Sequence, residues 1–80
     1  MAEERKADQI AQDYFAMGHS VSLINDVIAG DAMADEEDVD KKACVDRNVR
    51  HLELMVAKDD WGSESMTASK SAITAGKAYA

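Results

Sequence analysis

The chain has 80 residues, with 16 acidic and nine basic side chains and a net charge of −7. A chain of this length forms one small domain at most, and its excess of carboxylates disfavours binding to phosphate backbones and to anionic membrane surfaces. Proline is absent, aromatic residues make up 5% of the chain, and Cys44 is the one cysteine. The composition therefore favours helices over strands and excludes an internal disulfide framework.

The first expected element is a long helix over residues 3–29. Seven residues recur at alternating steps of three and four, as the a and d positions of a helical seam do: Ala7, Ile10, Tyr14, Met17, Val21, Ile24 and Ile28. Because this a/d seam keeps its phase across Gly18, we expect the helix to continue through that glycine, whose small size would let another backbone approach closely. Gly30 is expected to end the helix in the left-handed conformation.

A second helix is expected over residues 36–60. Asp35 is its expected N-cap, and acidic residues follow in the first turn, where the helix dipole favours anions. The apolar stripe of this helix consists of Val45, Val49, Leu52 and Val56. The connector after Gly30 is short, so the two long helices should be antiparallel neighbours.

A third, shorter helix is expected over residues 64–78, with Ser63 or Ser65 as its cap. It is only weakly amphipathic, so it either packs into a groove of the hairpin or becomes ordered on a partner. The sequence thus predicts an all-α fold in a single domain over residues 1–80. That domain is a long antiparallel helical hairpin with a short third helix, similar to a three-helix bundle.

Each long helix also carries apolar residues outside its main stripe. Either the third helix covers them and leaves a stray Phe or Leu exposed, or they form a protein interface. Trp61, at a helix end, either caps the core or is an exposed anchor, because Trp is enriched at interface hot spots. The interface hypothesis gives five candidate partner-binding residues: Phe15, Leu23, Val27, Leu54 and Trp61.

No catalytic, cofactor or metal motif is present in the sequence. The acidic run 31–40 lacks the spacing of an EF-hand loop, and His19 and His51 lack the spacing by which one helix face supplies two ligands. Cys44 suits a small core hydrophobe, since no histidine is placed beside it by the sequence. We therefore expect neither an enzyme nor a bound cofactor.

The start of the second helix forms an acidic patch of Asp35, Glu36, Glu37 and Asp38. Carboxylates at a helix start are ordinarily a solvated, electrostatically favourable terminus. The alternative hypothesis is that they imitate a phosphate backbone and occupy a basic surface of another protein.

The segment from Asn48 to Trp61, NVRHLELMVAKDDW, and the segment from Thr67 to Ala78, with its run AITAGKA, resemble small uncharacterised acidic helical proteins encoded by marine tailed phages. This resemblance covers roughly the second half of the chain and carries over no functional residues. It implies a phage setting, in which such proteins are virion components or early proteins that bind a host enzyme.

These observations predict a non-catalytic protein–protein interaction module, phage-encoded, that self-associates or binds a host or virion protein through a second apolar helix face. Direct contact with nucleic acid or membrane is not expected. The alternative is an acidic inhibitor, or nucleic-acid mimic, that blocks a basic site on a host enzyme. The single cysteine and the charged start of the chain favour a reducing cytoplasm, or a virion, over secretion.

Overall fold

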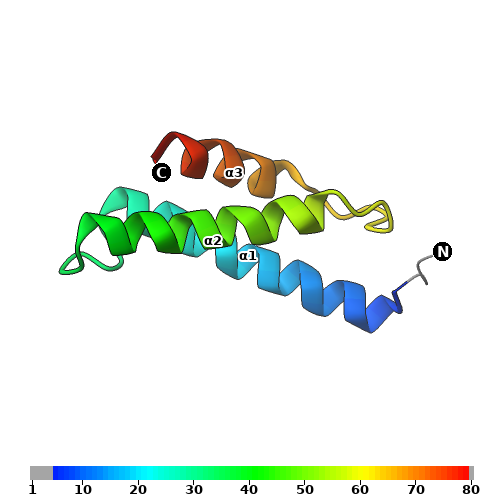
Figure 1. Ribbon diagram of the computed structural model, residues 1–80. Coiled ribbons are helices and arrows are strands. Elements are labelled where there is room, and N and C mark those ends of the chain that lie inside the picture. The colour runs from blue at the N-terminus through cyan, green and yellow to red at the C-terminus, as the bar shows by residue number, and fades with distance from the viewer. Residues whose placement is uncertain (1–4, 80) are drawn as a thin grey trace.

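The computed structural model describes residues 5–79, which form three helices that all pack against one another (Figure 1). Helix α1 spans Ala7–Ala29, α2 spans Asp38–Val56 and α3 spans Thr67–Tyr79. Figure 1 shows α1 and α2 running in opposite directions, with α3 lying along the pair. The predicted all-α, three-helix-bundle-like fold is confirmed for this part of the chain.

The helix boundaries differ from the predicted ones at both ends of α2. This helix begins at Asp38 and ends at Val56 instead of spanning 36–60. Its end is set by tertiary packing: the indole N–H of Trp61 donates to the Met55 carbonyl at 2.8 Å, so the chain must leave the helix in order to fold the ring back. Helix α1 begins at Ala7, so Arg5 and Lys6, which the predicted range 3–29 includes, precede the helix, and residues 3 and 4 of that range fall outside the described residues. Helix α3 is shifted towards the C-terminus relative to 64–78.

The connector between α1 and α2 confirms one predicted cap and contradicts the other. Gly30 adopts φ 84°, the predicted left-handed conformation, and ends α1. Asp35 is not the N-cap of α2, because Glu37 occupies that position and makes no side-chain capping bond. The reason is an additional turn in the connector, in which the Glu36 N–H donates to the Met33 carbonyl at 3.0 Å.

Two glycines inside helices have opposite surroundings. Helix α1 continues through Gly18 as predicted. The prediction that another backbone approaches Gly18 closely is wrong, because no atom of a neighbouring element lies within 4 Å of the place where a Cβ would stand. The close approach occurs instead at Gly76 of α3. A Cβ at Gly76 would overlap Val49 Cγ2 and lie 3.2 Å from Val45 Cγ1. Helix α3 therefore lays its backbone directly on α2.

The core lies between the three helices. The predicted stripe of α2 is confirmed, since Val45, Val49 and Leu52 are all buried. On α1 the buried arc is wider than the a/d seam: Met17 and Ile24 of the seam are buried, and so are Ser20 and Val27 beside it. The physical reason is that α1 packs against two helices, so its contact surface is wider than the seam a single hairpin partner requires.

Candidate functional site

Trp61 belongs to the hydrophobic core, with 7% of its surface exposed. Its ring lies 6.0 Å from that of Tyr14, centroid to centroid, and the guanidinium carbon of Arg5 stands 4.3 Å from the ring centroid. The interpretation of Trp61 as an exposed anchor is therefore wrong, and its interpretation as the cap of the core holds.

Arg5, two residues before α1, is bound to the α2–α3 connector. Its Nε donates to Asp60 Oδ2 at 3.0 Å and its Nη2 donates to the other oxygen of the same carboxylate, while Nη1 donates to Asp13 Oδ2 at 2.6 Å. The hydrogen bonds and charge of Arg5 lower the pKa of Asp60 to about 2 and lower the pKa of Asp13. Sequence reasoning missed this cluster, because residues so far apart along the chain carry no local signal of their contact.

Two further candidate residues do not lie on a free surface. Val27 is buried at 2% exposure in the core, and Leu23 is half-buried against it. Both were predicted on a second face of the first helix, but the buried arc of α1 is wider than its a/d seam and includes them. Only Phe15 and Leu54, at 78% and 70% exposure, remain on the surface.

Leu54 does not form an apolar patch with the other large exposed apolar residue of α2. Val39, exposed at 67%, lies near the opposite end of the helix. Between them on the same face are Asp46 and Arg50, joined by an ion pair at 2.9 Å. Leu54 is thus an isolated large apolar side chain on a charged face, which is ordinary on a protein surface.

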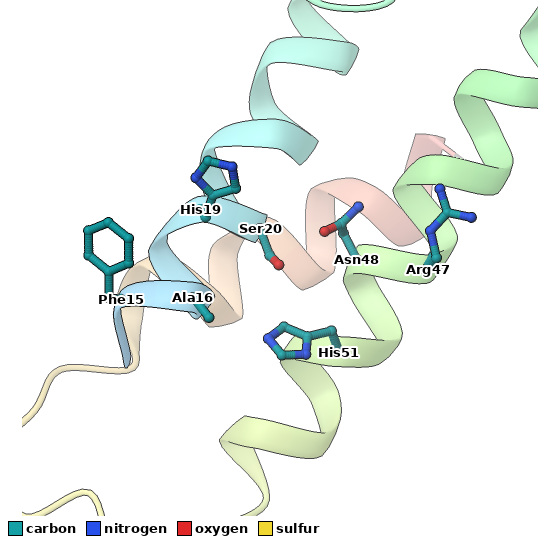
Figure 2. A pocket seen from close by; sticks show the side chains of 7 residues that line it. All are labelled: Phe15, Ala16, His19, Ser20, Arg47, Asn48 and His51. Atoms are coloured by element: carbon teal, nitrogen blue, oxygen red, sulfur yellow. The ribbon is translucent and has the colours of Figure 1, made fainter. Parts of the chain in front are cut away.

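Phe15 borders a groove of about 570 Å³ between α1 and α2, which we call the α1–α2 groove. Figure 2 shows Ser20, Asn48 and His51 facing the space between the two helices, whereas Phe15 points away from α2. None of the seven lining residues is acidic, although 16 of the 80 residues of the chain are. The lining comprises Phe15, Ala16, His19, Ser20, Arg47, Asn48 and His51.

A second hollow, of about 390 Å³, lies on α1 itself and is named here the Gly18 depression. It is open because Gly18 has no side chain and nothing packs over it. Phe15 and His19 line both this depression and the α1–α2 groove. Phe15 therefore stands as an exposed aromatic ring between two concave surfaces.

The acidic patch lies away from these hollows, at the turn from α1 into α2. Asp35, Glu36, Glu37 and Asp38 are all exposed. Asp38 lies 4.0 Å from the ammonium group of Lys41, a pair on the helix surface. The geometry is that of a solvated helix start.

The described residues offer little for catalysis. Within 5–79, no three His, Cys, Asp or Glu side chains are grouped so that they could hold a metal ion. Cys44 is buried, and the Asn48 amide donates to its carbonyl oxygen at 2.8 Å. His19 and His51 line the α1–α2 groove. Among the other residues that line it, Ser20 carries the one hydroxyl group, and there is no thiol or carboxylate.

None of the three described helices has the length and hydropathy required to cross a membrane. Comparison of the chain with protein-family models, with curated proteins and with solved structures finds no match.

Proposed function

We propose that this chain is a non-catalytic protein–protein interaction module that binds its partner with the surface of α1 around Phe15. The observation that carries the proposal is the 78% exposure of Phe15 between the α1–α2 groove and the Gly18 depression. Burying an aromatic side chain of this size is worth about 1.5–3 kcal/mol, which the isolated chain forgoes and a partner would recover. Aromatic side chains beside pockets are typical anchors of protein interfaces.

The resemblance to phage proteins supports a particular setting for this activity. In that setting the chain is phage-encoded and acts in the host cytoplasm or in the virion. Its partner is then a host enzyme, a virion protein or a further copy of the chain.

A matched pair of variants tests the proposal. Phe15→Ser and Leu54→Ser each remove one large exposed side chain from a helix, and neither residue belongs to the core. Proteins retained by the immobilised parent chain should also be retained by Leu54→Ser and lost with Phe15→Ser. Retention of the same proteins by Phe15→Ser would refute the proposal.

A second candidate function is the acidic inhibitor. It is favoured by the exposure of all four acidic residues of the acidic patch at a helix start. Replacing Glu36 and Glu37 by Gln and Asp38 by Asn should then abolish binding to a basic protein, together with the salt dependence of that binding. Binding that survives these changes would exclude this alternative.

A further inference from the structure

The exposed side of α1 carries a second helical seam that the core does not use. Its residues follow one another at steps of four, three, four, three and four, and every one of them is exposed. None is charged, in a chain whose net charge is −7. We call this surface the Phe15 face, and its members are Ala11, Phe15, Gly18, Ser22, Asn25 and Ala29.

The Phe15 face carries both a protruding side chain and a hollow. When two helices pack along a seam, each protruding residue enters a hole bounded by four residues of the facing helix. Such a hole requires residues at positions i, i+3, i+4 and i+7 of one helix. On α1 these positions are taken by Phe15, Gly18, His19 and Ser22. These same residues, together with Tyr14, line the Gly18 depression of about 390 Å³.

We propose that a second copy of this chain occupies the Phe15 face, with the two α1 helices antiparallel and each Phe15 seated in the Gly18 depression of the other copy. This inference rests on the proposed function and names its partner. A two-fold axis midway between residues 16 and 17 would oppose Phe15 to the partner's Gly18. The same axis opposes Ala11 to the partner's Ser22, because both pairs share that midpoint. In this one register, two facing pairs of Phe15-face residues form on each side of the axis.

Self-complementarity is the argument for a second copy. A two-fold interface uses the same patch on both subunits, so a patch must contain both the protrusion and its receptacle, and the Phe15 face contains both. The small side chains of Ala11 and Ser22 let the two helix backbones approach closely. Although the net charge of the chain is −7, two copies that meet on this uncharged stripe place no charged seam residues against each other.

Charge and shape both select the antiparallel arrangement. A parallel pair would set Phe15 against Phe15, leave both depressions empty and place Asp8, the seam position before Ala11, opposite its own copy. The antiparallel register instead opposes Asp8 to the partner's Asn25, an uncharged amide. Like charges directly opposite one another are thereby avoided at the ends of the seam.

The oligomeric state tests the inference directly. In sedimentation equilibrium the parent chain should show a concentration-dependent monomer–dimer equilibrium. Phe15→Ser, which removes the protrusion, and Gly18→Leu, which fills the hollow without touching its own core, should both be monomeric. Leu54→Ser, the matched control on α2, should remain dimeric. A parent chain that stays monomeric at the highest attainable concentration overturns the inference.

Cross-linking tests the register. In a Cys44→Ala background, Ala11→Cys together with Ser22→Cys should oxidise to a covalent dimer, since the two positions face each other across the axis at a distance a disulfide can span. The Ala11→Cys variant alone should remain uncross-linked at the same concentration. Rapid disulfide formation by Ala11→Cys alone would establish a parallel pair and refute the proposed arrangement.

These results separate the failure of this inference from the failure of the proposed function. If the parent chain is monomeric but Phe15→Ser still loses a foreign protein partner, the interaction module stands and the second copy is wrong. If neither self-association nor any other binding depends on Phe15, both proposals fail.

Discussion

The two glycines inside helices give the sharpest test of how this bundle is packed. Gly18 lies within α1 and Gly76 within α3, so the same change to Ala raises helix propensity by about 1 kcal/mol at each. Their surroundings differ. The new methyl group meets no atom within 4 Å at Gly18, whereas at Gly76 it overlaps Val49 Cγ2 and lies 3.5 Å from Ile24 Cγ2.

The expected magnitudes follow from this difference. Gly18→Ala should stabilise the fold by about 0.5–1 kcal/mol, since it gains the full propensity term. At Gly76 the added methyl group overpacks the core at a cost of about 1–3 kcal/mol, and Val49 is β-branched and cannot easily rotate away. The two variants should therefore differ by about 2 kcal/mol in unfolding free energy, which is about 10 °C in melting temperature for a domain of this size.

Circular dichroism during thermal and urea unfolding measures both values. The variants should be made in the Phe15→Ser background, so that self-association does not contribute to stability. A double-mutant cycle between Gly76→Ala and Val49→Ala should show a favourable coupling, because removing the valine methyl groups makes room for the added one. Equal stability of the two Ala variants, or a cycle without coupling, would refute the close packing of α3 on α2.

Two further predictions concern the cluster at the start of α1. Trp61→Ala should cost about 3–5 kcal/mol and leave most of the population unfolded, as far-ultraviolet circular dichroism would show. Trp61→Phe, which loses the bond to the Met55 carbonyl, should cost only about 1 kcal/mol. Comparable stability of the two variants would contradict the buried position of the ring. Arg5 lowers the pKa of Asp60 from its ordinary value of 3.8 to about 2. Between these pH values the unfolded chain binds more protons than the folded chain, so the stabilisation by the Arg5–Asp60 pair is complete above about pH 4 and is lost as the pH falls to 2. The urea midpoint of Asp60→Asn should consequently fall less steeply than that of the parent as the pH is lowered over this range. If the midpoints of the two proteins fall in parallel, the Arg5–Asp60 ion pair does not cause the loss of stability.

The candidate site was only partly predictable. The sequence pointed to Phe15 and Leu54 as apolar residues outside the main stripes, and both are exposed. It also gave Val27 and Trp61 as candidates for that surface, and both are buried. A helical pattern shows that a helix has two apolar sides, but it does not show which of them a third helix will cover.

What the sequence determined by itself is local. The three helices, the left-handed Gly30 and the stripe of Val45, Val49 and Leu52 follow from periodicity and capping, which act within a few residues along the chain. The tertiary structure alone decided that α1 is flanked by two helices, that Trp61 folds back under Arg5, and that the backbone of α3 meets α2 at Gly76. These features depend on contacts between residues far apart in sequence, and only the packing of all three helices determines which apolar side is buried and which is left exposed around Phe15.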